Sequence, residues 1–374
     1  MKKNELSHDN LRNILESKEI ATSAPCRIDM GGTLDISTFY YPLRYLNPCT
    51  FNIAIGLRTQ VHLLPFDKGM VKVSSRGFKN AEYPVDKLPF DHPLGLMFAV
   101  AAYFRVEGIH IDIYSASPPR SALGGSSVAA VALTEAFRKL LAPPGSWLLA
   151  EGQHTKNRIQ QPTAIYRHKS AMLAHAIESS VAGVPCGIQD QLAAAYGGVN
   201  AWYWRGEPDG PAFEKQAIVE KESYEDLEKQ ILVAYCGIPH ESKNINQRWV
   251  RQFLLGKYRE LWVEIAGCTQ KFTDAMINRD IKKAVESMNR EVIIRRGMTS
   301  DVFDEIGEML VGTAVKNNCG ARFTGAGGGG CIWALGEPGN IDKLRGIWKE
   351  VLSEREGACL LDVNIDHEGL KVEN

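Results

Sequence analysis

Residues 109–141 read IHIDIYSASPPRSALGGSSVAAVALTEAFRKLL, and this stretch decides the fold. Apolar residues alternate over 109–115, which predicts a half-buried strand. Over 128–141 the apolar residues recur at i, i+3, i+4 and i+7, which predicts a helix. The loop between them points backbone N–H groups and the positive end of a helix dipole at one place, and this arrangement favours phosphate.

A second interpretation of this loop stays open from the residues alone. Ser126 or Ser127 would also serve as the capping residue of a helix that begins near residue 128. The loop is not a Walker A motif, because no Gly-Lys-Ser/Thr follows its glycines. The loop therefore predicts either a phosphate site or a capped helix start.

Strands and helices continue on both sides of this unit without regular β-α-β alternation. Strand-like alternation and helix-like periodicity recur at 51–63, 71–75, 170–182 and 191–196. A turn cluster at 205–211 precedes a second group of elements with long helical patterns. We expect an α+β fold of two domains, residues 1–215 and 216–374.

The composition excludes several classes of protein. The 374 residues carry 43 basic and 44 acidic side chains, a formal net charge of −1, whereas a face that binds nucleic acid is usually basic. The longest apolar run, residues 94–104, is about half the roughly 20 residues of a membrane helix, and the polar start MKKNELSHDN is no secretion signal. Eight scattered cysteines without a CxxC pair fit reduced thiols, so we expect a cytoplasmic protein that binds neither nucleic acid nor membrane.

Residues 325–330, GAGGGG, match the dinucleotide-binding pattern GxGxxG letter for letter. That pattern requires a helix after the glycines, but the next residues are CIWAL, which predict a strand. Two interpretations remain for the glycine run. It is either a tight hairpin turn or a loop that packs against the substrate or against the loop at 117–127, called the phosphate loop below. Glycine would permit close backbone approach there.

Four segments, in this order along the chain, resemble the motifs of the GHMP kinases (galactokinase, homoserine, mevalonate and phosphomevalonate kinases). They are APCRIDMGGTLD at 24–35, PPRSALGGSSVAA at 118–130, Glu178 with GVPCGIQDQ at 183–191, and RFTGAGGGGC at 322–331. The resemblance implies an N-terminal domain like domain 2 of ribosomal protein S5, a ferredoxin-like C-terminal domain and a site between them. In the phosphate loop, Ala122 and Gly125 stand where the family usually has glycine and serine.

The third segment narrows the resemblance to sugar kinases. PCGI-x-DQ resembles galactokinase, and QDQLAAAYGGVN at 189–200 resembles the heptose-phosphate kinases and their fucokinase-like relatives. The implied function is phosphorylation of a hydroxyl of a small-molecule sugar or sugar phosphate, with ATP and Mg²⁺, and the resemblance is compatible with a homodimer. Two alternatives stay open, namely a kinase of a non-sugar alcohol such as mevalonate or homoserine, and a catalytically silent regulator that binds sugar and ATP.

The resemblance also implies roles for individual residues. Asp190 would accept or orient the proton of the substrate hydroxyl, and Arg27 would hold Asp190 ionised and stabilise charge on the transferred group. Ser126 and Glu178 would bind Mg²⁺, a cation that prefers oxygen ligands. Taken alone, Asp190 would equally cap a helix at 191–196 and Glu178 would be a solvent-facing helix residue.

The remaining implied contacts fall on several segments. The nucleotide would be held by Pro119, Leu123, Gly124, Gly125, Ser126, Ser127, Gly327 and Gly328. The substrate would contact Gly32, Asp35, Asp190, Tyr235 and His240. Residues 153–169 carry four basic side chains and predict a solvated helix or loop, or else a lid that contacts a substrate phosphate.

Overall fold

The described residues, 8–142, 162–207, 209–239 and 242–373 of a computed structural model, form two sheets with helices packed on them. Within these residues the larger sheet has eight strands and the smaller sheet has four. The larger sheet consists of β1 (Ile20–Met30), β2 (Cys49–Pro65), β3 (Met70–Ser75), β4 (Ala81–Pro84), β5 (Ile109–Ser115), β6 (Val199–Trp204), β7 (Phe213–Val219) and β12 (Lys371–Glu373). The smaller sheet consists of β8 (Ile231–Tyr235), β9 (Gly320–Phe323), β10 (Cys331–Leu335) and β11 (Cys359–Leu361).

The described helices fall into two groups along the chain. Those of the first part are α1 (His8–Ser17), α2 (Ser37–Tyr40), α3 (Gly95–Phe104), α4 (Gly125–Leu140), α6 (Pro162–Val181) and α7 (Gln189–Tyr196). Those of the second part are α8 (Tyr224–Glu228), α9 (Ser242–Leu254), α10 (Arg259–Ile277), α11 (Ile281–Met298), α12 (Glu305–Lys316) and α13 (Pro338–Leu352).

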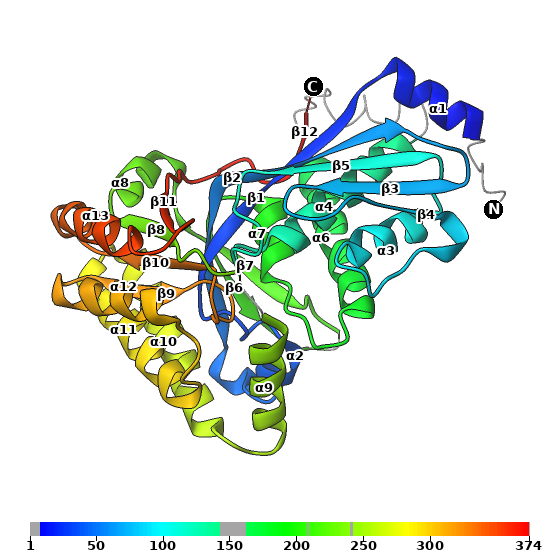
Figure 1. The fold of residues 1–374 in the computed structure, drawn as a ribbon. Coiled ribbons are helices and arrows are strands. Elements are labelled where there is room, and N and C mark those ends of the chain that lie inside the picture. Colours follow the sequence, from blue (N-terminus) through cyan, green and yellow to red (C-terminus); the bar gives the residue numbers. More distant parts are fainter. Residues whose placement is uncertain (1–7, 143–161, 208, 240–241, 374) are drawn as a thin grey trace, which may run out of the picture.

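The larger sheet runs in the order β12-β1-β2-β5-β3-β4, and β6 and β7 extend it from the first residues of β2. Its pairs are antiparallel except for β3 and β5, which run parallel. In Figure 1, α3, α4 and α6 lie together against one face of this sheet. The burial of α4 explains the packing, since Val128, Leu133 and Phe137 are all without exposed surface.

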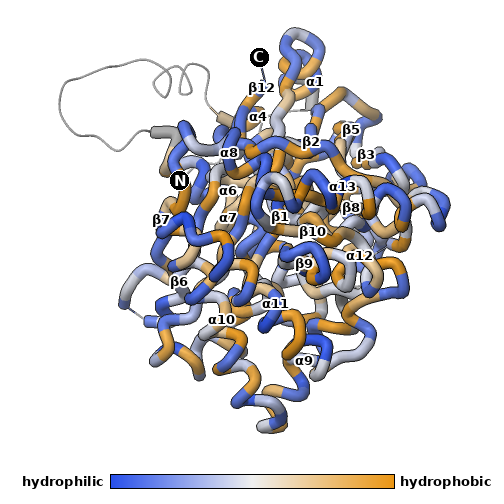
Figure 2. The backbone as a smooth tube through the Cα atoms, turned by 90° about the vertical axis from the view of Figure 1, so that its left-hand side faces the viewer, coloured by the Kyte–Doolittle hydropathy of each residue, from blue (hydrophilic) through white to orange (hydrophobic). Residues whose placement is uncertain are grey.

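The smaller sheet is antiparallel, in the order β11-β8-β10-β9. Figure 1 shows α10, α11, α12 and α13 gathered beside it. Helix α10 also packs on the larger sheet, where Phe272 contacts Phe51 of β2. Its core is rich in aromatic side chains, among which Trp249, Trp262 and Trp348 are fully buried. Figure 2, turned by 90°, shows hydrophobic and hydrophilic stretches alternating along the same elements, as expected where one face of each element is buried.

The elements predicted from the sequence are present with shifted ends. The strand at 109–115 is β5, and the helix predicted from 128 begins three residues earlier, at Gly125. The helix predicted over 191–196 begins at Gln189 and therefore includes Asp190. These elements and the mixed sheets confirm the α+β class.

The larger sheet draws residues from both predicted domains. Strand β7 spans the boundary at residue 215, and β12 returns from the end of the chain to pair with β1. Just before β12, Ile365 forms a bridge with Ile55. The division into 1–215 and 216–374 stays a prediction, and the first sheet continues to residue 219 and takes back residues 371–373.

The eight cysteines, all within the described residues, are free thiols. In the part of the chain that the structure describes, we find no helix with the length and apolar character of a membrane span.

Candidate active site

A cleft of about 400 Å³ opens where the phosphate loop meets the first residues of the glycine run. Its walls come from segments far apart in the chain: β1 and the loop after it, the loop from β5 to α4, the turn from α6 to α7, and Gly325 with Ala326. Most of the residues that the sequence analysis selected lie around this cleft. They are Arg27, Asp35, Pro119, Gly124, Gly125, Ser126, Ser127, Glu178 and Asp190.

The phosphate loop ends in a helix start that leaves backbone donors free of the helix. Gly124 is the N-cap with a φ of 83°, and no side chain caps the helix. The first bond within α4 runs from Val128 N to Gly124 O at 2.9 Å, so the amides between these residues have no partner within the helix. The predicted serine cap is therefore wrong: Ser126 is exposed in the cleft and Ser127 bonds elsewhere. The free amides at the start of α4 therefore suit the binding of an anion in the phosphate loop.

Arg27 and Asp190 form an ion pair at the floor of the cleft. Arg27 Nε and Nη2 both lie 2.8 Å from Asp190 Oδ1. Arg27 Nη1 donates to the carbonyl of Ala122 at 2.7 Å, which ties the pair to the phosphate loop. Burial lowers the pKa of Arg27, but the Asp190 and Asp29 carboxylates outweigh it and the pKa is raised. The guanidinium therefore stays charged beside Asp190.

Asp190 does not cap its helix, contrary to the alternative that the sequence left open. The N-cap of α7 is Ile188, and Asp190 lies in the first turn with its side chain 23% exposed to the cleft. A Cβ built on Gly124 would lie 3.1 Å from Asp190 Cγ, so the carboxylate packs directly under the phosphate loop. This position suits a group that acts on an atom next to a bound phosphate.

Glu178 faces the cleft and not the solvent. Its Oε1 accepts from Ser127 Oγ at 3.0 Å, and its Oε2 accepts from Gln191 Nε2 at 2.6 Å. Burial raises the pKa of Glu178 to about 7, against the lowering effect of the Ser127 bond. Both hydrogen-bond partners are neutral, so Mg²⁺ fits here: it would supply the opposite charge, and Ser126 adds a hydroxyl oxygen in the same cleft.

Asp35 also lines the cleft, beside the start of α7. Its Oδ2 accepts from the backbone N of Gln189 at 3.0 Å. Gly187 makes this approach possible, since a Cβ there would lie 1.8 Å from the same oxygen. Burial raises the pKa of Asp35 to about 6, although the Gln189 bond lowers it.

Some predicted site residues lie away from the cleft. Leu123 is fully buried in the core, although its carbonyl accepts from Arg27 N at 3.2 Å. Tyr235 sits in the smaller sheet opposite Cys331. Gly32 directs its carbonyl to Arg295 Nη2 at 2.7 Å. His240 lies outside the described residues.

Gly327 and Gly328 also differ from the prediction that they hold the nucleotide. Gly328 N donates to the carbonyl of Val302 at 2.8 Å, and a Cβ on Gly328 would meet Ile245 Cδ1 at 2.6 Å. A Cβ on Gly327 would lie 2.7 Å from the same Val302 carbonyl. The glycine run is thus the turn of the β9–β10 hairpin, and only its start reaches the cleft.

The basic segment 153–169 is described only from residue 162 onward, where α6 begins. Arg167 is partly buried, and burial lowers its pKa against the raising effect of Glu368 and Asp366. Arg167 and Lys169 are not among the residues that line the cleft. Of the two predictions for this segment, the described part agrees with the helix. Residues 153–161 lie outside the described residues.

Among the cleft residues that sequence reasoning missed, Gln189 and Thr33 lie next to its motifs. Gln189 lines it, and its buried Oε1 has no hydrogen-bond partner. Thr33, with a φ of 78°, lines it as well. Gln189 precedes the predicted aspartate and Thr33 lies between Arg27 and Asp35, so proximity to the motifs was the available signal.

Comparisons with known proteins place these residues in context. Residues 94–198 match the family model described as the GHMP kinases N terminal domain. A mevalonate kinase of Pyrococcus horikoshii is 24% identical over 388 residues, and the match covers 95% of this chain and 98% of the relative. A D-glycero-alpha-D-manno-heptose 7-phosphate kinase of Campylobacter jejuni is 23% identical over 369 residues, with the same coverage. The solved structure of a D-glycero-D-manno-heptose 1-phosphate kinase from Bacteriodes thetaiotaomicron superimposes with a TM-score of 0.68 at 17% identity, covering 95% of this chain and 99% of that one.

Proposed function

We propose that this chain, which carries a GHMP kinase N-terminal domain and has the two-domain α+β GHMP kinase fold, transfers the terminal phosphoryl group of ATP to a hydroxyl of a sugar or sugar phosphate. One observation carries the proposal: the Asp190 carboxylate, held by Arg27 at 2.8 Å, lies directly under the phosphate loop. A carboxylate in that place would meet the hydroxyl that attacks a phosphoryl group bound in the loop.

Different residues of the cleft would carry out different steps of the phosphoryl transfer. The start of α4 would bind phosphate oxygens through its free amides and helix dipole. Asp190 would accept the hydroxyl proton as the oxygen attacks, and Arg27 would keep that carboxylate ionised and oriented. Mg²⁺, when bound by Ser126 and Glu178, supplies charge neutralisation at the phosphate oxygens.

Acceptor oxygens that line the cleft support a polyhydroxy substrate. Asp35 and the unpartnered Oε1 of Gln189 both present oxygen atoms, and Asp190 presents a third. Hydrogen-bond acceptors of this kind are satisfied by hydroxyl donors, and a sugar offers several of these in a small volume. The QDQLAAAYGGVN run at 189–200, which resembles heptose-phosphate kinases, supports the same substrate class.

Phosphorylation of mevalonate is the second candidate, and the full-length similarity to the Pyrococcus horikoshii mevalonate kinase favours it. Mevalonate carries a carboxylate, and a buried anion requires a cation or several donors beside it. Arg27, Arg76 and Arg120 line the cleft and would serve a carboxylate or a phosphate alike. The acceptor oxygens of Asp35 and Gln189, which suit hydroxyl donors, are what favours the sugar. The sugar therefore remains the first proposal.

A panel of acceptors decides between these functions. Purified protein is mixed with ATP and Mg²⁺ and with aldoses, their 1- and 7-phosphates, mevalonate or homoserine, and release of ADP is measured. We expect acceptor-dependent ADP release with one sugar or sugar phosphate, and a rate at least about a hundredfold lower with Asp190→Asn. If only mevalonate is phosphorylated, the second candidate function is correct and the sugar kinase function is wrong. ATP binding without turnover on any acceptor would favour the silent regulator.

A further inference from the structure

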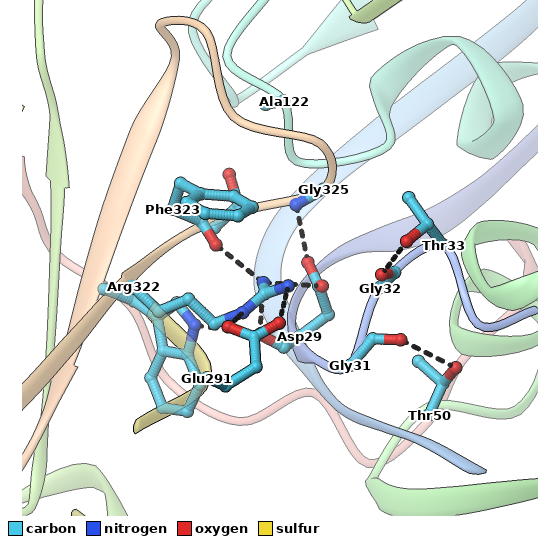
Figure 3. Close-up of polar contacts among 12 residues, drawn as sticks. Asp29, Gly31, Gly32, Thr33, Thr50, Ala122, Glu291, Arg322, Phe323 and Gly325 are labelled. Carbon is cyan, nitrogen blue, oxygen red and sulfur yellow. Dashed lines mark hydrogen bonds and ion pairs between the residues drawn. The ribbon is translucent and has the colours of Figure 1, made fainter. Parts of the chain in front are cut away.

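A continuous chain of charged side chains runs from the cleft into the second half of the molecule. Its three guanidinium groups and three carboxylates balance, and every member except Asp190 is buried. The members, in order, are Asp190, Arg27, Asp29, Arg322, Glu291 and Arg295. Figure 3 shows its central part, with Asp29 and Glu291 on opposite sides of the Arg322 guanidinium.

Asp29 connects the two halves of this network of ion pairs. It follows Arg27 by two residues on β1, so both side chains lie on the same face of the strand. Its Oδ1 accepts from the backbone N of Gly325 at 2.7 Å and lies 3.4 Å from Arg27 Nη1. Its Oδ2 accepts from Arg322 Nη1 at 3.0 Å. Asp29 has no exposed surface, so it does not touch a molecule bound in the cleft.

The network of ion pairs reaches the cleft at a second point, beyond Arg322. Glu291 accepts from Arg322 Nε at 3.1 Å and from Arg295 Nε at 2.9 Å. Arg295, stacked 4.6 Å from the rings of Trp249 and Trp262, donates to the carbonyl of Gly32 and to Thr33 Oγ1. Since Thr33 lines the cleft, both ends of the chain are fixed to it.

Stability alone does not account for such a network. The free energy needed to remove paired charges from water often exceeds what their attraction returns, and packed apolar residues of similar size serve stability as well. An ionic network differs in that it fixes the direction of each hydrogen bond. Here the direction that matters is that of the Arg27 guanidinium, whose Nε and Nη2 hold Asp190.

We propose that Asp29 is a positioning residue for phosphoryl transfer, acting through Arg27 and through the amide of Gly325; the inference rests on the proposed function. Arg27 Nη1 lies 3.4 Å from Asp29 Oδ1 and donates to the carbonyl of Ala122, whereas Nε and Nη2 hold Asp190. It also ties the start of the glycine run to β1, which keeps that wall of the cleft in place. Without its charge, Arg27 and Arg322 face each other with no anion between them.

The test is Asp29→Asn, which keeps the size of the side chain but removes its charge. We expect kcat to fall by about 10- to 100-fold per folded molecule, because small misplacements of reacting groups have effects of this size. The KM for ATP should change little, since the phosphate loop is intact. Asp366→Asn is the matched control: this carboxylate is also buried and pairs with Arg58, but it lies away from the cleft, so kcat should hold.

A double-mutant cycle separates positioning from general damage. If Asp29 acts through Arg27, Asp29→Asn should lower kcat by less than about threefold once Arg27→Lys is present. If the kcat losses of Asp29→Asn and Arg27→Lys multiply in the double variant, the proposal is overturned. An unchanged kcat in folded Asp29→Asn overturns it as well. If that variant does not fold, Arg322→Lys, which weakens the hold on Asp29 but keeps the charge, is put through the same cycle with the same deciding outcomes.

A second readout does not depend on activity. In protein labelled with ¹⁵N-arginine, the Nε–Hε and Nη signals of Arg27 are assigned by their loss in Arg27→Lys. We expect slow, restricted rotation of this guanidinium in the original protein and in Asp366→Asn, and faster rotation in Asp29→Asn. Unchanged Arg27 signals in Asp29→Asn overturn the positioning role. A protein that phosphorylates no acceptor overturns the proposed function instead, and the Arg27 signals still decide the role of Asp29.

Discussion

The two glycine-rich segments of this chain look alike in composition and behave differently in the fold. In the loop that ends at Ser127, the amides ahead of Val128 have no partner within α4 and face the cleft. In the glycine run, Gly325 N donates to Asp29, and Gly328 N and Gly330 N donate to the carbonyls of Val302 and Ile238. The first loop has donors to offer a ligand, whereas the second has used its donors on the protein.

This difference shows that glycine content marks backbone freedom and not its purpose. Glycine in the phosphate loop allows a helix to start with its amides uncovered. Glycine in the hairpin permits left-handed turns and close packing, as at Gly330, where a Cβ would lie 2.7 Å from the carbonyl of Ser121. The two segments nevertheless touch, since Cys331 N donates to that same carbonyl at 2.9 Å. The hairpin therefore supports the loop that faces the cleft.

The largest effect should come from the carboxylate under the phosphate loop. Asp190→Asn keeps the shape but removes the proton acceptor, and general-base catalysis contributes about 10²–10⁴-fold, so kcat should fall by at least about a hundredfold. ATP affinity should barely change, because the loop amides remain. Turnover and nucleotide affinity measured on one preparation check this, and near-normal turnover would remove Asp190 from the mechanism.

The next effect concerns the metal beside the same loop. Glu178→Gln should raise the Mg²⁺ concentration needed for half-maximal activity by about tenfold or more, because a charged ligand is lost. Glu135→Gln is the control: Glu135 is also partly buried and accepts from a serine, Ser170, at 2.6 Å, but lies outside the cleft. An equal Mg²⁺ requirement in both variants would return Glu178 to a structural role.

The comparison of the two loops is tested by placing valine in each. Gly125→Val should leave stability nearly unchanged, since a Cβ there would meet nothing closer than Ser117 Oγ at 3.8 Å. Its side chain would enter the cleft and displace a phosphate oxygen from the loop amides. A lost hydrogen bond to a charged group costs about 1.5–3 kcal/mol, so the KM for ATP should rise by about tenfold or more.

Gly328→Val should show the reverse pattern. The φ of Gly328 is +76° and Ile245 leaves no space for a Cβ, so stability should fall by about 1–3 kcal/mol while the KM for ATP in folded protein stays the same. Thermal unfolding and ATP kinetics on both valine variants settle the matter. If Gly328→Val instead weakens ATP binding at unchanged stability, the glycine run is a ligand-facing loop and the comparison is broken.

The smallest effect is a dependence of stability on pH without Mg²⁺. The pKa of Glu178 is raised from 4.5 to about 7, so the folded protein keeps a proton that the unfolded chain has lost. Stability from this group is therefore highest below pH 4.5 and falls as the pH rises to about 7. In EDTA, the melting temperature should fall between pH 4.5 and 7, and Glu178→Gln should make this fall smaller by roughly 2–4 °C. A slope identical to that of the unmodified protein would show that Glu178 titrates normally.

The local elements around the site were predictable because their causes are local. Alternation over 109–115 and helical periodicity after it are properties of neighbouring residues, and they produced β5 and α4 with ends shifted by a few positions. The Asp190 position was also recoverable, since the motif around it lies within a dozen residues. The inclusion of Asp190 in the helix was not predictable from its neighbours. The helix starts at Gln189, whose amide donates to Asp35, 154 residues away in the sequence.

The sequence by itself determined the α+β class, the strand–loop–helix unit at 109–141 and the motif around Asp190, because each can be recognised from the pattern of residues in short segments. Tertiary structure alone decided that Glu178 bonds Ser127, that Gly327 and Gly328 face away from the cleft, and that Asp29 joins Arg27 to Arg322. Asp29 and Arg322 are 293 residues apart. Their pairing follows from the packing of two sheets, and no local pattern of residues encodes which buried charges that packing brings together.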